Sequence, residues 1–150
     1  MAVQLAQTDA EVRACWPVMA QLRPHLNEAE FVKRVGEQAR EGYRLTFIRR
    51  GESVAAVAGF RLMQCLSWGR FLYVDDLVTD EKTRSSGLGA ELLDWLCEYA
   101  RAQGYDRLEL DSGVQRFGAH RFYFRKRMTI KCYHFSMELK PSPTAGSSPI

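Results

Sequence analysis

Residues 71–90 restrict the possible folds of this chain more than any other segment, because they predict a strand, a turn and a helix that begins with glycine. Phe71 to Thr79 (FLYVDDLVT) is rich in the apolar and β-branched residues of a buried strand. Arg84 to Ala90 (RSSGLGA), here called the glycine loop, then opens an amphipathic helix. A helix start leaves backbone N–H groups without partners, and glycines remove side chains that would keep a phosphate away. The segment therefore predicts a pyrophosphate site.

A second motif lies one helix and one strand further along the chain, where residues 111–113 (DSG) precede residues 119–123 (AHRFY). The Arg-x-x-Gly-x-Gly pattern of residues 84–89 followed by this motif resembles the GNAT superfamily of acetyl-CoA-dependent N-acetyltransferases. Their cofactor loop reads Arg/Gln-x-x-Gly-x-Gly/Ala, and many members carry Ala-x-x-Phe-Tyr. The resemblance covers roughly residues 44–139, and the N-terminal part matches by architecture alone.

Apolar periodicity predicts the remaining elements. Strands are expected over residues 3–6, 43–49, 53–62, 71–79, 108–111 and 129–139, with helices between Thr8 and Pro24, from Asn27 to Gly42, from the glycine loop to Gly104, and over 119–126. The order β-α-α-β-β-β-α-β-α-β is that of the GNAT fold. We therefore expect an α/β (α+β) domain over residues 1–140, with a mixed, mostly antiparallel central sheet flanked by helices. Residues 141–150 (PSPTAGSSPI) are expected to form a flexible tail.

Composition supports one ordinary globular domain, with 46% hydrophobic and 26% charged residues among 150. We expect no membrane partner and a cytoplasmic location, because the sequence has neither a run of about 18 apolar residues nor the features of a signal peptide. The four widely spaced cysteines form no Cys-x-x-Cys pair, so no metal site is expected. The net charge of +3 is modest, and nucleic acid is not an expected partner despite basic residues between Arg116 and Lys131.

Two other phosphate-binding motifs are excluded by the residues around the glycine loop. A Walker-type loop needs a lysine, and none follows Gly89. A dinucleotide fingerprint needs a third glycine, but Leu92 stands at that position.

The resemblance assigns cofactor contacts to the strand end, which would hold pantetheine, and to the glycine loop, which would bind pyrophosphate. The residues expected to contact acetyl-CoA are Leu77, Val78, Thr79, Arg84, Ser85, Ser86, Gly87, Leu88, Gly89, Ala90 and His120. An N–H group near Val78 would stabilise the oxyanion. Tyr123 would protonate the leaving thiolate, although the aromatic run over residues 122–124 also suits core packing.

Asp75 and Asp76 interrupt an apolar strand in which aspartate is disfavoured. In the resembling family the equivalent strand carries a bulge and splays from its parallel neighbour, and carboxylates in that slot could orient or deprotonate an amine. The alternative is structural, with one carboxylate bonding backbone around a bulge and the other solvated. The general base stays open among Asp75, Asp76 and water.

The resulting hypothesis is an acetyltransferase that moves an acetyl group from acetyl-CoA to an amine by direct transfer. The alternative is a non-catalytic acyl-CoA-binding or interaction module on the same fold, which only turnover would separate from an enzyme. The acceptor is expected to be a small-molecule or peptide amine. Asp75 and Asp76 favour a cationic acceptor, whereas Arg23 and His25 would argue the other way if they face the slot. The apolar final strand would also allow a homodimer.

Overall fold

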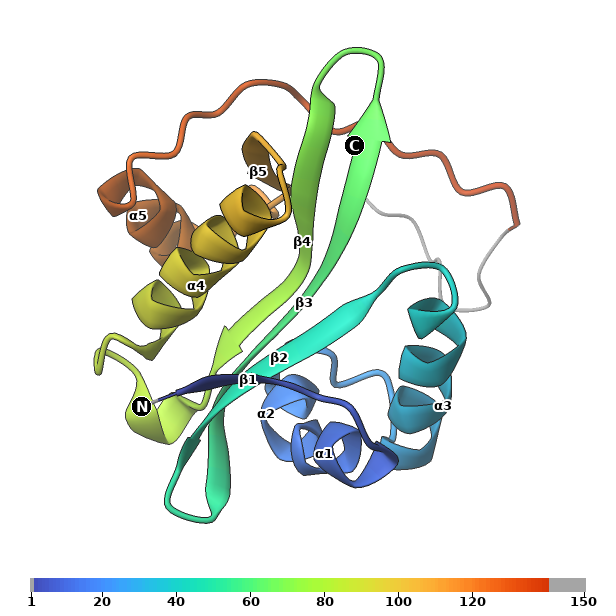
Figure 1. Cartoon of the computed structure of the whole chain (residues 1–150), viewed down its shortest axis with the longest axis vertical. Coiled ribbons are helices and arrows are strands. Elements are labelled where there is room, and N and C mark those ends of the chain that lie inside the picture. The colour runs from blue at the N-terminus through green and yellow to red at the C-terminus, as the bar shows by residue number, and fades with distance from the viewer. Residues whose placement is uncertain (1, 141–150) are drawn as a thin grey trace. The chain divides into compact units, whose positions relative to one another are not determined.

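The computed structural model describes residues 2–140, and the expected tail lies outside the described residues (Figure 1). The chain divides after Ser112 into two compact units. The first unit holds a sheet with helices, and the second begins with Gly113 and includes helix α5 (Phe117–Arg125). None of the helices in residues 2–140 combines the length and hydropathy needed to cross a membrane.

A five-stranded sheet with the order β1-β2-β3-β4-β5 forms the first unit. Its strands are β1 (Val3–Leu5), β2 (Arg44–Arg50), β3 (Ser53–Cys65), β4 (Gly69–Thr79) and β5 (Arg107–Leu110). The first four run antiparallel to their neighbours, and β5 runs parallel to β4. The mixed, mostly antiparallel sheet confirms the predicted fold class. β3 is central, as its nearly continuous apolar run over residues 54–60 requires.

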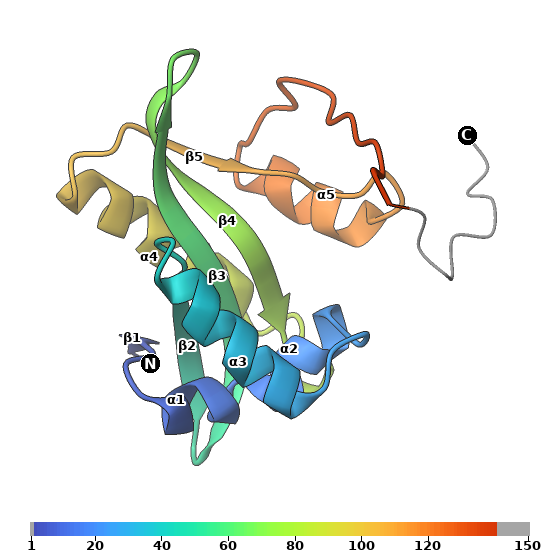
Figure 2. The same ribbon diagram turned by 90° about the vertical axis from the view of Figure 1, so that its right-hand side faces the viewer.

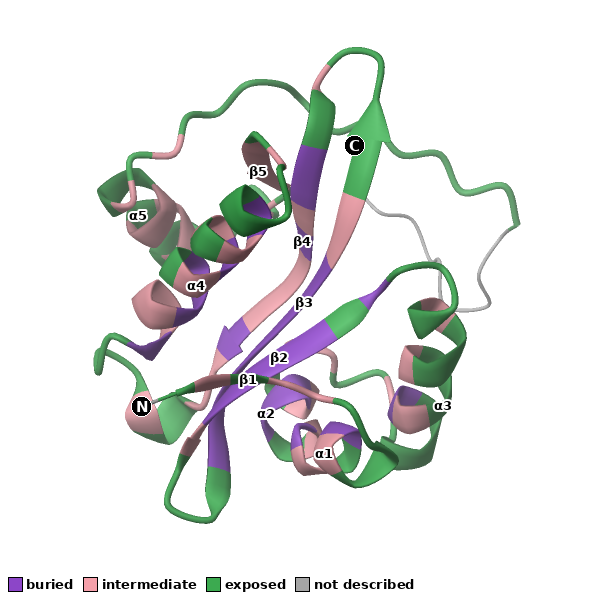
Figure 3. Cartoon of the chain, in the orientation of Figure 1, coloured by how far each residue is buried: buried purple, intermediate pink, exposed green. Residues whose placement is uncertain are grey.

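Helices cover both faces of this sheet (Figures 1 and 2). α1 (Asp9–Ala14), α2 (Trp16–Leu22) and α3 (Glu28–Ala39) lie on one face, and α4 (Leu88–Ala102) lies on the other. Side chains of successive sheet residues alternate between the two cores: Val57 packs with α1–α3, and its neighbours Ala56 and Ala58 pack with α4. Buried residues accordingly follow β2, β3 and the inner side of α4 (Figure 3).

The single helix predicted between Thr8 and Pro24 is two helices, α1 and α2, which meet at Cys15. The capping box that opens α1 is present, because the Thr8 hydroxyl accepts the Glu11 N–H and the Glu11 carboxylate accepts the Thr8 N–H. Pro17 lies in the first turn of α2. Proline has no N–H to continue the hydrogen-bond ladder, so it is favoured at a helix start, and a new helix begins there.

The strand predicted over residues 129–139 is wrong. After α5 the described chain up to residue 140 contains no strand, and Ile130, Tyr133, Phe135 and Met137 are exposed. Their spacing has the alternation of a strand, but a strand also needs a neighbour that pairs with its N–H and C=O groups. Among residues 2–140, none supplies that pairing.

Packing of α4 on the sheet should dominate the stability of the first unit. Leu92 is fully buried between α4 and the sheet, whereas Leu66 at the β3–β4 turn is fully exposed. Leu92→Ala should lower the free energy of unfolding by about 2–5 kcal/mol through lost burial and a residual cavity. The matched control Leu66→Ala should change it by less than about 0.5 kcal/mol. Urea denaturation of both variants checks the difference, and equal effects would contradict the described packing.

Candidate functional site

β4 carries a bulge at the aspartate pair. Gly59 pairs with Asp76 and Phe60 pairs with Val74, so Asp75 is an extra residue on β4. β5 pairs with β4 only from Phe71 to Val74. Beyond Val74, no strand of the described chain pairs with this edge of β4. The strand therefore bulges and parts from its parallel neighbour, as the sequence resemblance implies.

The backbone of β4 beyond the bulge has a defined orientation. The Asp80 N–H donates to the Ala55 carbonyl at 2.8 Å. In an antiparallel pair, bonding residues alternate along the strand, so Val78, paired with Val57, directs its N–H and C=O towards β3. Leu77 and Thr79 direct theirs towards the open edge. Of the three predicted contacts on this strand, these two offer backbone groups to a ligand lying along the edge.

The glycine loop joins β4 to α4 through a short 3₁₀ helix, Glu81–Thr83. Ser85 and Gly87 have positive φ values of 67° and 83°, which turn the chain into the helix start. Gly87 is the N-cap and provides no side chain to bond the end of the helix. A Cβ added at Gly87 would meet no atom within 4 Å, so the space beside this residue is open.

The N-terminal N–H groups of α4 are available to a ligand. Glu91 is the first residue of this helix whose N–H bonds backward, to the Gly87 carbonyl at 3.0 Å. The N–H groups of Leu88, Gly89 and Ala90 have no acceptor among residues 2–140. Unpaired N–H groups at the positive end of a fifteen-residue helix are groups to which an anion can bind. The glycine loop and the open edge of β4 thus lie in the same unit, consecutive along the chain.

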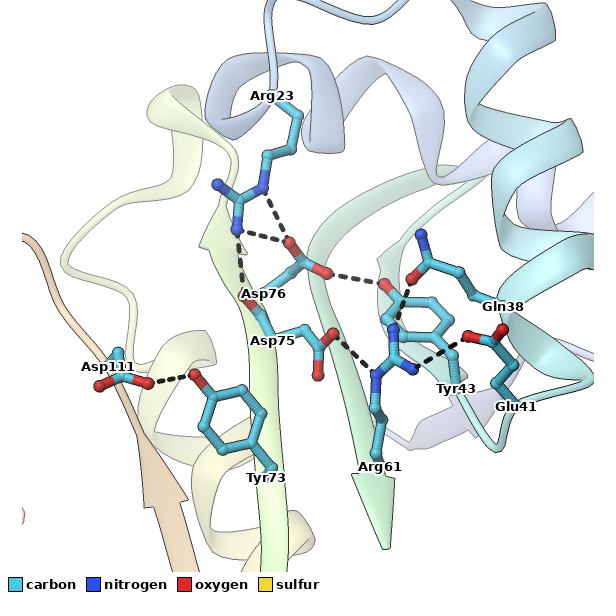
Figure 4. A network of polar contacts seen from close by, with 9 residues as sticks. All are labelled: Arg23, Gln38, Glu41, Tyr43, Arg61, Tyr73, Asp75, Asp76 and Asp111. Carbon is cyan, nitrogen blue, oxygen red and sulfur yellow. Dashed lines mark hydrogen bonds and ion pairs between the residues drawn. The ribbon is translucent and has the colours of Figure 1, made fainter. Parts of the chain in front are cut away.

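Both aspartates are held by arginines on the side of β4 that faces α2 and α3 (Figure 4). Asp76 accepts hydrogen bonds from the Tyr43 hydroxyl at 2.8 Å and from Arg23 Nε at 2.9 Å. Asp75 Oδ2 accepts from Arg61 Nε at 3.0 Å. The simple structural alternative, with one carboxylate bound to backbone and the other solvated, therefore does not describe this pair.

The two carboxylates differ in how completely they are satisfied. Asp75 Oδ1 is buried and has no hydrogen-bond partner among the described residues. Burial raises the pKa of Asp75 and outweighs the opposing effect of Arg61. The pKa of the Tyr43 phenol is raised well above its usual value by burial and by Asp76, so Tyr43 remains a donor to that carboxylate. Both oxygens of Asp76 thus have hydrogen-bond partners, and Asp75 keeps one oxygen for a further partner.

Gly59 makes this arrangement possible, and sequence reasoning missed its role. A Cβ at this position would lie 1.9 Å from the Tyr43 hydroxyl oxygen and 2.7 Å from Asp76 Oδ2. The tyrosine and the aspartate occupy the space that any other residue would need. A glycine inside an otherwise apolar strand is a signal of such close approach.

A cavity of about 360 Å³ opens beside the bulge, here called the β4 cavity. Asp75 and Asp76 line it from β4, Arg23 and His25 line it from the connection between α2 and α3, and Arg34 lines it from α3. Arg23 and His25 therefore line the same cavity as the aspartates. Arg61, whose contact holds Asp75, was not recognised from the sequence because its partner lies on the next strand.

Tyr73 links β4 to the chain after β5. Its hydroxyl donates to the Asp111 carboxylate, just beyond the last pair of the parallel strands, Val74 and Leu110 (Figure 4). Burial and Asp111 raise the pKa of the Tyr73 phenol, which keeps the donor protonated. This contact ties the two strands together at the point where they part.

The second sequence motif lies in the other unit. His120 Nε2 donates to the Gly113 carbonyl at 2.8 Å, which gives this ring a structural partner within the unit. Tyr123 lies on α5, its hydroxyl has no partner among residues 2–140, and burial raises the pKa of its phenol against an opposing effect of Arg116. Contact of His120 or Tyr123 with a cofactor stays a prediction. Within residues 2–140, no three His, Cys, Asp or Glu side chains are grouped to hold a metal ion.

The close approach at Gly59 yields a direct test. Gly59→Ala should lower the free energy of unfolding by about 1–3 kcal/mol, because the methyl group displaces the Tyr43 hydroxyl from Asp76. Gly36→Ala is the matched control: Gly36 lies within α3, with open space where a Cβ would be, so alanine should stabilise by up to about 1 kcal/mol. Thermal and urea unfolding measure both. A stabilised Gly59→Ala variant would contradict the described contact.

Comparison with known proteins identifies the family. Residues 6–128 match the acetyltransferase (GNAT) family. The chain is 34% identical over 122 residues to the uncharacterized N-acetyltransferase YhdJ of Bacillus subtilis, covering 80% of this chain and 86% of the relative. It is 33% identical over 66 residues to the aminoalkylphosphonate N-acetyltransferase of Salmonella typhimurium, covering 44% of this chain and 43% of the relative.

A solved structure agrees with the fold. The acetyltransferase Tb11.01.2886 of Trypanosoma brucei superimposes with a TM-score of 0.75 at 19% identity, over 92% of this chain and 99% of that one. The match to the family pattern spans most of the chain, and β4 carries the bulge that the resemblance implies. This chain belongs to the GNAT family of acetyltransferases.

Proposed function

We propose that this protein transfers an acetyl group from acetyl-CoA directly to the amine of a small acceptor. The observation that carries the proposal is that the first unit has two sets of backbone groups without hydrogen-bond partners among residues 2–140. One is the start of α4, where the N–H groups of Leu88, Gly89 and Ala90 lack acceptors. The other is the edge of β4 beyond Val74, which lacks a neighbouring strand in the described chain. A pyrophosphate suits the first, and an extended amide chain suits the second.

Residues of the glycine loop would hold the phosphates. The N–H groups from Ser85 to Ala90 would donate to the pyrophosphate, and the open space at Gly87 accommodates its oxygens. Arg84 is exposed at the beginning of the loop and would shape it or add a cation. Acetyl-CoA supplies the acetyl group as an activated thioester.

The open edge of β4 would position the reacting carbonyl. Leu77 and Thr79 would bond the pantetheine amides as an added strand would, because their backbone groups face that edge. We expected the oxyanion donor near Val78, and the alternation along the strand favours the N–H of Leu77 or Thr79 for this role. A fixed backbone donor stabilises the developing negative charge without reorganisation.

Asp75 would receive the acceptor amine. Asp75 lines the cavity and its buried Oδ1 has no hydrogen-bond partner among residues 2–140, whereas Asp76 is occupied by Tyr43 and Arg23. The raised pKa of Asp75 makes it a better proton acceptor than an ordinary aspartate. Asp75 is therefore favoured over Asp76 as the general base, with an ordered water as the remaining alternative.

Tyr123 would donate a proton to the departing sulfur as the amine nitrogen forms its bond to the acetyl carbon. Its raised pKa keeps the phenol protonated at neutral pH. The cytoplasmic location and the homodimer stay predictions, and the latter has lost the final strand on which it was based.

Binding of acetyl-CoA tests the glycine loop. Gly87→Glu should abolish the thermal stabilisation that acetyl-CoA gives the wild-type protein, because a carboxylate would occupy the phosphate site. Gly51→Glu is the matched control. It has a positive φ of 58° and open space at the Cβ position, but lies in the β2–β3 turn. Its melting temperature should still rise with acetyl-CoA. Full stabilisation of Gly87→Glu would contradict the assignment.

Turnover tests Tyr123 as the general acid. Tyr123→Phe removes one oxygen and keeps the ring, so kcat should fall by about 100-fold while acetyl-CoA binding is preserved. The control is Tyr133→Phe, in the same unit at an exposed position, which should leave kcat unchanged. Release of coenzyme A in the presence of an accepted amine provides the measurement. Full turnover of Tyr123→Phe would make this tyrosine a packing residue, and acetyl-CoA binding without any turnover would favour the non-catalytic alternative.

A further inference from the structure

Charged groups of both signs line the β4 cavity, and both of its aspartates are paired with arginines, Asp76 with Arg23 in the lining and Asp75 with Arg61 behind it. Arg23 forms an ion pair with Asp76 at 2.8 Å, and Arg61 forms one with Asp75 at 3.0 Å. These two pairs cancel. The charge that the cavity presents to a ligand is therefore set by the groups outside these two ion pairs.

Three groups in the cavity have no partner among residues 2–140. Asp75 lines the cavity from β4, and its Oδ1 is a buried acceptor without a donor. On the opposite wall, the Arg34 guanidinium and the His25 imidazole make no hydrogen bond or ion pair, and both are exposed to solvent at the cavity. One wall thus offers an acceptor for a donor group, and the other offers donors for an anion.

We propose that the acceptor is a small amine that also carries an oxyanion, with its amino group at Asp75 Oδ1 and its carboxylate or phosphonate at Arg34 and His25. This inference rests on the proposed acetyl transfer and names the substrate class of the same site. A buried carboxylate oxygen gains most from a charge-assisted N–H donor, which an amine supplies. An arginine presents the forked donors that match a carboxylate or a phosphonate.

The size of the cavity and the charges that line it both restrict which acceptors fit. A volume of about 360 Å³ is near the lower limit for small-molecule pockets, so a short linker between amine and anion is expected. A polyamine would bring a second cation towards the Arg34 guanidinium, and like charges repel. An amine without an oxyanion would leave the Arg34 guanidinium solvated and gain nothing from it.

A panel of short amines tests this inference on the wild-type protein. The panel consists of 2-aminoethylphosphonate, β-alanine, ethanolamine and putrescine, with coenzyme A release as the readout. At least one of the two anionic amines should exceed ethanolamine and putrescine by about tenfold or more in kcat/KM, and the ratio of phosphonate to carboxylate identifies the preferred oxyanion. Equal or better use of ethanolamine or putrescine would overturn this inference and leave acetyl transfer standing. Absence of transfer to all four amines would overturn the inference and count against the proposed function, which acetyl-CoA binding then tests separately.

A matched pair of arginine variants locates the anion. Arg34→Gln should lower kcat/KM for the preferred anionic amine by about tenfold, mainly through KM, because an exposed guanidinium gives the lower end of a charge-assisted bond. The same variant should use the poorer neutral amine as the wild-type protein does. Arg40→Gln removes the same charge at the end of α3, outside the cavity, and should change neither rate. A uniform loss for both amines in Arg34→Gln, or equal losses in both variants, would refute the placement of the anion.

Discussion

An extra residue enters β4 at Asp75, where the strand leaves its parallel neighbour, and two arginines hold the resulting pair of carboxylates. A half-buried carboxylate is costly unless it is paired, and two adjacent ones also repel each other. Arg61 bonds Asp75, while Arg23 and Tyr43 bond Asp76. These groups come from three parts of the chain: Arg23 directly follows α2, Tyr43 directly precedes β2, and Arg61 lies in β3. The helices on this face therefore stabilise the bulge as well as cover the sheet.

The bulge gives one strand two kinds of chemistry. Before it, β4 pairs with β5 on one edge and β3 on the other. Beyond it, Leu77 and Thr79 direct backbone groups towards the unpaired edge, while Asp75 and Asp76 line the β4 cavity. Backbone groups suit a ligand that resembles a strand, and charged side chains suit a small polar ligand. The acetyl donor and the amine acceptor would thus be held by the same few residues without competing for the same atoms.

Local signals in the sequence predicted the first five strands, the glycine loop and the helix that follows it, because each depends on residues close together in the chain, and the family resemblance implied the bulge. The glycines of the loop leave space at a helix start, and an aspartate in an apolar strand conflicts with the strand's pattern, so both signals can be recognised without knowing the fold. The errors have causes that local patterns do not contain. The alternation over residues 129–139 could not reveal whether a neighbouring strand exists. Arg61 and Gly59 gained their roles from Asp75, Asp76 and Tyr43, which only the folded sheet brings next to them.

The missing hydrogen bond at Asp75 Oδ1 links the stability of the fold to ligand binding. A carboxyl group whose pKa is raised by folding binds more protons in the folded state than in the unfolded one, so its contribution to stability falls as pH rises through the raised value. The cause is the buried oxygen without a donor, since Arg61 satisfies only the other oxygen. An ammonium bound at Oδ1 would supply that donor and lower the pKa again. Ligands that stabilise the charged form at Asp75 therefore also stabilise the fold, and the free protein retains at its bulge an unsatisfied acceptor for an amine.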